Sequence, residues 1–150
     1  MKCRYLRGGE NMAFEWTAEL LTGTAQIDNE HKELLKAANE FMEACAEGRG
    51  RQEIVWAAEY LSNYAKVHFE HEEALQLKSR YPNYRGHKCW HNAYVLAIET
   101  LMDKLIDEGG TLALVGAVNR IIAKVIIHVK TCDTWFAQYL QNIPNELDPL

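Results

Sequence analysis

The sequence lacks the features that usually mark membrane, secreted and nucleic-acid-binding proteins. Its 150 residues contain no apolar run near the roughly 18 residues that a membrane span needs, and the chain begins without a signal-peptide hydrophobic block. Its 16 basic residues are outnumbered by 21 acidic ones, and they form no long basic stretch. With a net charge of −5, we expect a cytoplasmic protein with no membrane insertion and no nucleic-acid partner.

Cysteine is also scarce, and its placement excludes two common kinds of site. The four cysteines, Cys3, Cys45, Cys89 and Cys132, form no Cys-x-x-Cys pair, which argues against a zinc knuckle and against a thioredoxin-like motif. The last three fall in helical patterns. We expect them to be reduced and to lie in or near the core.

Four long segments repeat apolar residues at helical spacing, and none alternates over any length as a β-strand would. The pattern predicts helices at about 25–46, 51–79, 83–107 and 111–142, the last with Thr111 as its N-cap. Connections of about three to eight residues make consecutive helices antiparallel. We therefore expect an all-α protein, an antiparallel up-down-up-down four-helix bundle over residues 25–142. An N-terminal arm (1–24) would precede it, and a C-terminal tail (143–150) would follow.

Five of the six histidines fall, together with two carboxylates, on the predicted inward faces of these helices. They form four short clusters: His31; His68 with Glu72; His87 with His91; and His128 with Asp133. A single histidine on an apolar helical face is more often a hydrogen-bonded core residue than a metal ligand. Burying seven such groups without partners, however, would cost several kcal/mol each. The set therefore predicts a metal centre in the bundle core.

The spacing within the last cluster is unusual for one helical face. Five residues separate His128 from Asp133, and on a regular helix this separates their directions by about 140°, against about 40° for a spacing of four. Both side chains reach one centre only if a π-bulge widens the helix, or if the Asp approaches the cluster from another side. His71 points away from the inward face, and we expect it at the solvated rim with Glu70 and Glu73 exposed.

The donor set indicates two metal ions. Seven ligands are too many for one tetrahedral zinc, whereas carboxylates can bridge two metals about 3.5 Å apart. Iron, copper, nickel and zinc all accept imidazole ligands. If Glu72 and Asp133 both bridge, together with an oxide or hydroxide, three histidines complete six-coordination on one metal, such as iron, and two leave the other five-coordinate. That second metal could bind a small ligand. Oxidases and oxygenases of the ferritin-like class use four carboxylates with Glu-x-x-His pairs, a motif that is absent from this chain. The comparison favours reversible binding over oxygen activation.

Four motifs carry a family resemblance: Ile27-Asp28-x-x-His31, His68-Phe69-x-x-Glu72-Glu73, Tyr84-x-x-His87-x-x-x-His91, and His128-Val129-Lys130-Thr131-x-Asp133. From about Phe14 to Tyr139 the chain resembles a hemerythrin, specifically the single-domain bacterial form called bacteriohemerythrin. The resemblance implies two non-haem irons with a bridging oxide or hydroxide, and O2 as the reversibly bound ligand. It also implies that His87, His91 and His128 bind one iron, that His31 and His68 bind the other, and that Glu72 and Asp133 bridge them.

From this resemblance we expect a monomeric O2 carrier, storage or delivery protein that is not an enzyme, with no delivery partner indicated by the sequence. The alternatives are an O2 or redox sensor domain, and a di-iron peroxidase or nitric-oxide-handling enzyme. Lys124 stands where relatives often have Trp, and Val125 where they often have Leu, and we expect both to border the O2 pocket. Met12 begins a stretch like a family N-terminus, so residues 1–11 are expected to be an upstream extension.

Overall fold

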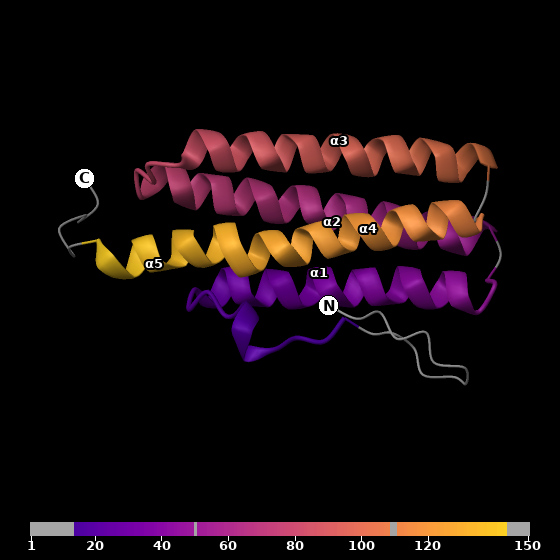
Figure 1. The fold of residues 1–150 in the computed structure, drawn as a ribbon, viewed down its shortest axis with the longest axis horizontal. Helices are drawn as coiled ribbons and strands as arrows, with labels where there is room; N and C mark the ends of the chain where they lie inside the picture. Colours follow the sequence, from indigo (N-terminus) through magenta and orange to yellow (C-terminus); the bar gives the residue numbers. More distant parts are fainter. Residues whose placement is uncertain (1–13, 50, 109–110, 144–150) are drawn as a thin grey trace.

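A computed structural model describes residues 14–49, 51–108 and 111–143, and it shows long helices that run antiparallel along one axis (Figure 1). They are α1 (Ala25–Ala46), α2 (Arg51–Lys78), α3 (Tyr84–Glu108) and a fourth rod made of α4 (Leu112–His128), the π-helical segment η2 (Val129–Asp133) and α5 (Thr134–Asn142). The described ranges contain no β-strand. The predicted all-α bundle is confirmed, with predicted helix ends within one residue of those observed. The expected start at Met12 and most of the C-terminal tail lie outside the described residues.

Local interactions explain where the helices begin and end. Thr111 is the predicted N-cap of α4, and its hydroxyl oxygen accepts a hydrogen bond from the Leu114 backbone N–H at 3.3 Å. Gly48 (φ 62°) follows α1 and Arg80 (φ 57°) follows α2, both in the left-handed region that closes a helix. Directly after α2, the Tyr81 backbone N–H donates a hydrogen bond to the carbonyl of Gln76 at 2.9 Å. These closures reverse the chain within a few residues.

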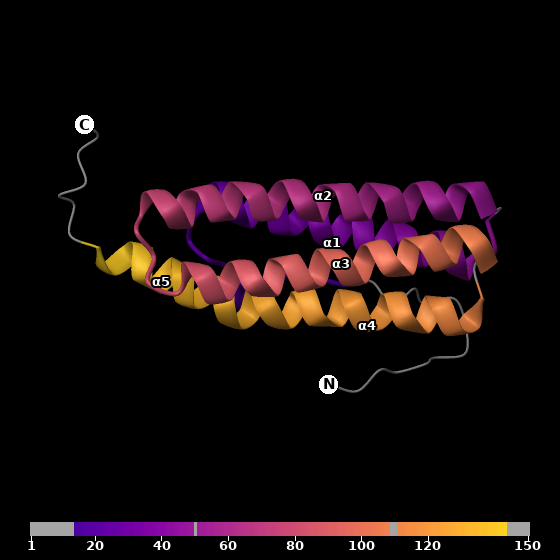
Figure 2. The same cartoon turned by 90° about the horizontal axis from the view of Figure 1, so that it is seen from above.

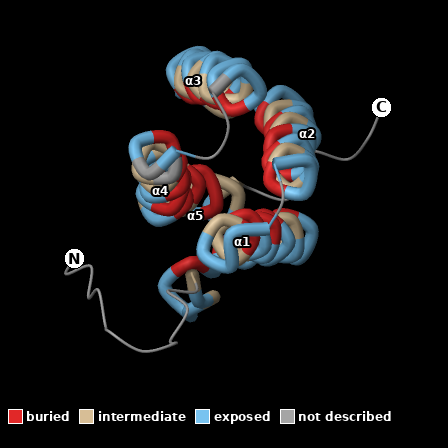
Figure 3. The backbone as a smooth tube through the Cα atoms, turned by 90° about the vertical axis from the view of Figure 1, so that its right-hand side faces the viewer, coloured by how far each residue is buried: buried red, intermediate tan, exposed pale blue. Residues whose placement is uncertain are grey.

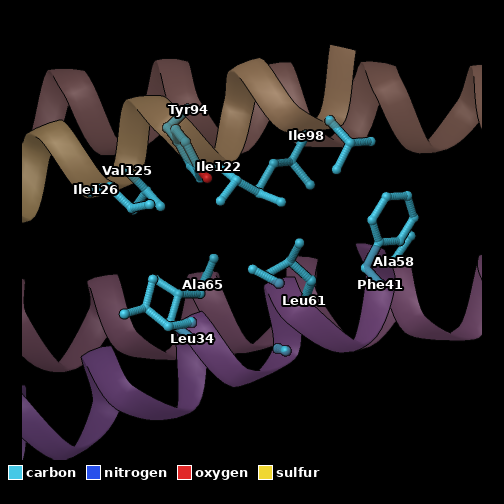
Figure 4. Packing of buried hydrophobic residues seen from close by; sticks show 14 of the residues in the cluster. Leu34, Phe41, Ala58, Leu61, Ala65, Tyr94, Ile98, Ile122, Val125 and Ile126 are labelled. Atoms are coloured by element: carbon cyan, nitrogen blue, oxygen red, sulfur yellow. The ribbon is translucent and has the colours of Figure 1, made fainter. Parts of the chain in front are cut away.

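The four rods occupy the corners of a square. Helix α1 packs against α2 and α4, and α3 packs against the same two helices (Figure 2). Their buried faces turn towards the common axis, and their exposed faces point outwards (Figure 3). Apolar side chains including Phe41, Leu61, Ile98 and Ile122 meet along this axis (Figure 4). Burying each of them fully contributes about 1.5–3 kcal/mol, which holds the rods together.

Antiparallel packing brings the candidate residues to one end of the bundle. The predicted donors lie early in α1 and α3, late in α2, and from the end of α4 to the end of η2 in the fourth rod. Because consecutive helices run in opposite directions, these four positions fall at the same level along the axis. None of the described helices combines the length and apolarity that crossing a bilayer requires.

The N-terminal arm is tied to this same end. From residue 14 onwards it contains one short 3₁₀ turn, η1 (Ala18–Leu20), which lies beside η2. The buried Asp28 carboxylate accepts hydrogen bonds from the Thr22 backbone N–H at 2.7 Å, the Thr22 hydroxyl at 2.8 Å and the Gly23 N–H at 3.2 Å. Asn39 pairs with the backbone of Phe14 through bonds of 2.6 and 3.0 Å. The Asp in the Ile-Asp-x-x-His motif therefore anchors the arm.

Not every expectation for single residues holds. Cys45 and Cys132 are half-buried as expected, but Cys89 is exposed, so the prediction of a core or near-core position was wrong for this residue. It occupies an outward position on α3 between two residues that face other helices. All three cysteines are free.

Candidate metal centre

The structure brings together all seven predicted donor side chains, and each is at most 2% exposed. They form two groups in which the donor atoms lie within 4.8 Å of one another: Glu72, His87, His91, His128 and Asp133 in one, and His31, His68 and Asp133 in the other. Asp133 is common to both groups. The side chains come from four different rods, so only the assembled bundle creates the cluster.

The fourth rod reaches the cluster through a widened turn. Segment η2 is π-helical, and it places His128 Nε2 only 3.1 Å from an oxygen of Asp133 despite their five-residue spacing. The π-bulge, one of the two alternatives for this spacing, is confirmed. Side chains support the altered turn, because the Thr134 hydroxyl donates to the Val129 carbonyl at 3.0 Å and the Thr131 hydroxyl donates to the Ile127 carbonyl at 2.7 Å.

The donor atoms of the larger group lie as close together as the ligands of one metal ion do. His128 Nε2 lies 2.9 Å from His87 Nε2 and 3.2 Å from His91 Nε2. Glu72 Oε2 lies 3.3 Å from the Nε2 atoms of His87 and His91, and Asp133 Oδ1 lies 3.2 Å from that of His87. Neighbouring donors about 2.1 Å from an octahedral metal are about 3 Å apart. The five side chains could therefore hold one metal ion between them.

In the smaller group, His31 Nε2 lies 3.2 Å from Asp133 Oδ2, and the rings of His31 and His68 meet edge to face with their centroids 4.6 Å apart. Asp133 thus directs one oxygen to each group, and it could bridge a metal ion in one group to a metal ion in the other. Glu72 belongs to the larger group alone, and its Oε1 is buried without a hydrogen-bond partner among the described residues. A bridging role for Glu72 stays a prediction.

Unpaired buried atoms test whether the cluster fits metal ions. Both oxygens of Glu72 and of Asp133, both ring nitrogens of His31, and His68 Nε2 lack hydrogen-bond partners in the described part of the chain. The carboxylate oxygens lie 3.1–3.3 Å from histidine nitrogens, but these contacts do not have the angles of hydrogen bonds. Each unpaired group would cost about 1–3 kcal/mol. Metal ions coordinated at these centres would satisfy the donors, so the residues fit a two-metal site.

Electrostatics prepares these groups as ligands. Burial raises the pKa of Asp133, but the histidines around it, His128 first, hold that pKa well below its usual range. Burial and the charge of Asp133 raise the pKa of Glu72, yet the adjacent His87 and His91 lower it overall. Burial lowers the pKa of His128. These shifts favour anionic carboxylates and a neutral His128 imidazole, the forms that coordinate metals.

Two further carboxylates hold the outer nitrogens of ligand rings. Glu30 Oε2 lies 3.0 Å from His68 Nδ1, and Glu73 Oε1 lies 3.1 Å from His91 Nδ1. Burial raises the pKa of Glu30, but hydrogen bonds from His68, Gln26 and His71 outweigh it and lower the pKa to about 2.

The exposure of the side chains around the cluster corrects one prediction and confirms two others. Glu73 is only 12% exposed, so the prediction that it is exposed was wrong. Sequence spacing missed its role because the contact crosses to the neighbouring helix α3. Glu70 is exposed and His71 is 50% exposed, as predicted.

A small apolar cavity of about 10 Å³ borders His31. We call it the His31 cavity, and its lining is Trp16, Leu20, His31, Leu34, Leu35, Val125, Ile126 and Val129. Its size corresponds to about one water-sized sphere. Val125 belongs to this lining, whereas Lys124 is exposed and does not line the cavity. That the two residues border an O2 pocket stays a prediction.

Sequence reasoning missed the contribution of the arm to this cavity. Trp16 lies with its ring centroid 6.3 Å from that of His31, and the Lys32 ammonium sits 5.4 Å from the centre of the indole. Leu20, in η1, is only 3% exposed. The presence of apolar residues in an otherwise aperiodic arm was the available indication that the arm packs on the bundle.

Aromatic rings also fix two ligands from outside the cluster. Trp90 stacks on His128 with centroids 3.6 Å apart, and Phe69 stacks on His91 at 3.9 Å, each pair with an interplanar angle of 10°. These stacked aromatic rings restrict rotation of the two imidazoles and exclude water from one face of each.

Fold and site together define a four-helix-bundle protein with a buried histidine and carboxylate cluster that can hold metal. The family model described as Hemerythrin HHE cation binding domain matches residues 22–141. The chain therefore belongs to the hemerythrin family.

Solved structures agree with this assignment at the level of the fold. Two crystal structures, titled as a leucine-to-tyrosine mutant of hemerythrin and as a leucine-to-phenylalanine mutant, are each 24% identical to this chain, with a TM-score of 0.78. Each match covers 86% of this chain and 98% of theirs. A leucine-to-alanine mutant of hemerythrin is 23% identical, with a TM-score of 0.77, 85% of this chain covered and 96% of its own. A search of curated proteins found no match.

Proposed function

We propose that this protein binds O2 reversibly at a pair of non-haem irons and acts as an O2 carrier, store or delivery protein. The observation that carries the proposal is the convergence of five histidines and two carboxylates into two groups that share Asp133. Two irons held by these residues, with a bridging oxide or hydroxide, would supply the electrons that O2 takes up. Membership of the hemerythrin family supports the choice of iron.

In this proposal each half of the centre has its own histidines. His87, His91 and His128 hold one iron, and His31 and His68 hold the other. Asp133 spans both halves, as its two oxygens already face both groups. Glu72 would complete the bridge through its unpaired Oε1.

The chain's own residues favour O2 over water and anions as the ligand. The His31 cavity adjoins the two-histidine half, and every residue lining it except His31 is apolar. An apolar lining gives water and anions few hydrogen-bond partners, so it favours an apolar ligand such as O2. Imidazoles outnumber carboxylates five to two among the donors, which limits the negative charge on the irons. This balance supports binding rather than O–O cleavage, so we propose no enzymatic activity.

An anaerobic O2 titration followed by visible spectroscopy tests the proposal. The reduced protein should be colourless, gain a visible band as O2 is added, and bleach when O2 is removed. Colour that appears but does not bleach would indicate oxidation without release. That result would overturn the proposed carrier role and would favour a sensor or an enzyme.

A further inference from the structure

Each half of the metal centre contains one histidine whose outer nitrogen meets a carboxylate. In the two-histidine half, Glu30 on α1 lies 3.0 Å from Nδ1 of His68 on α2. In the three-histidine half, Glu73 on α2 lies 3.1 Å from Nδ1 of His91 on α3. Glu30 directly precedes the predicted ligand His31, and Glu73 directly follows the predicted ligand Glu72. Each of the two contacts a predicted ligand on the next helix. The same contact between a carboxylate and a ligand histidine therefore occurs once in each half.

The two carboxylates are themselves held in the same way. The second oxygen of Glu30 lies 2.7 Å from His71 Nδ1 and accepts from Gln26 Nε2 at 3.0 Å. The second oxygen of Glu73 accepts from the Lys88 ammonium. Glu30 and Glu73 are 13% and 12% exposed, whereas His71 and Lys88 are 50% and 44% exposed. Each carboxylate is thus fixed between a buried ligand and a solvent-facing side chain.

This arrangement differs from that of the other three histidines. Nδ1 of His31, His87 and His128 has no hydrogen-bond partner in the residues that the structure describes. A neutral imidazole carries one N–H, and a carboxylate can only accept, so a bond at Nδ1 leaves the Nε2 lone pair for a metal. The negative charge beside the ring also makes the Nε2 lone pair of the imidazole more basic and a stronger metal ligand.

We infer that Glu30 and Glu73 are positioning residues that set the tautomer and ring orientation of His68 and His91, one in each half of the centre. This inference rests on the proposed metal site and extends it to the residues that prepare it. Because these contacts join protein groups alone, the two rings can present Nε2 to the cluster before an ion binds. Metal binding at each half then requires less reordering.

The test uses the full-length protein with Glu30→Gln, Glu30→Ala, Glu73→Gln and Glu73→Ala. Glu33→Gln on α1 and Glu70→Gln on α2 are matched controls, because both carboxylates are exposed and neither contacts a ligand histidine. In metal-free, ¹⁵N-histidine-labelled protein at alkaline pH, long-range ¹H–¹⁵N spectra report the tautomer of each ring. We expect Nδ1–H on His68 and His91 in the wild type and controls, with Nε2–H gaining in the matching Ala variant.

Metal affinity gives the second readout. In a Co²⁺ titration against a chelator, each Ala variant should weaken one of two Co²⁺ sites about 10- to 100-fold, and each Gln variant should weaken it less, because the amide oxygen still accepts from Nδ1–H. Unchanged tautomers in both Ala variants would overturn the inference, even if affinity fell. Affinities equal to those of the controls would also overturn it. Neither readout involves O2, so a failure of the proposed O2 binding would be seen separately.

Discussion

Enlarging the His31 cavity should open the centre to solvent, and Val125→Ala is the direct way to do so. Val125 is 3% exposed and lines the cavity from α4. The substitution removes two buried methyl groups, worth about 1.6 kcal/mol at about 0.8 kcal/mol each. The enlarged cavity adds about 24 cal/mol per Å³ that does not collapse, so the total loss should be about 2–3 kcal/mol.

Val118→Ala provides a matched control for the loss of packing. Val118 is also in α4, two turns away, is 5% exposed and does not line the cavity. Urea unfolding of the metal-free proteins should show similar destabilisation for both variants. Decay of the visible oxy band in air should be several-fold faster for Val125→Ala only, because entering water or anions promote oxidation of the irons. Equal decay rates in the two variants would refute the role of the cavity.

Four further outcomes are expected. Elemental analysis of protein isolated from cells should give two irons per chain, and one metal or chiefly zinc would contradict the assignment. His91→Ala should lose iron and melt at a lower temperature because metal binding contributes to folding free energy, whereas His71→Ala should keep both irons, since its partner carboxylate retains its bond to the buried ligand. Burial lowers the pKa of His87, but the two adjacent carboxylates raise it to about 9. The stabilisation from this proton in the metal-free protein is present below about pH 6.5 and should be lost as the pH rises through about 9, which thermal melts across this range would detect. Lys124→Trp should leave the lifetime of the oxy form unchanged because Lys124 is exposed, and a longer lifetime in the same decay assay would show that this position does control access.

Sequence periodicity was enough to predict the fold and to place the seven candidate donors on buried faces. Apolar residues at helical spacing specify which face of a helix is buried, and that face carried all seven donors. The five-residue spacing of His128 and Asp133 left a widened turn as one of two alternatives, and η2 provides it. These features depend on local backbone geometry, so they can be read along one chain segment at a time.

Contacts between segments could not be read in this way. Helical spacing assigns a residue to a face, but the rotation and axial shift of neighbouring helices decide what that face meets. Glu73 was expected in solvent, yet it reaches His91 on α3. Trp16, in an aperiodic arm, covers the His31 cavity, whereas Lys124 turns away from it. The sequence alone determined which residues could bind metal. Tertiary packing decided that Asp133 joins the two groups and which side chains surround them, because these depend on distances between segments far apart in the chain.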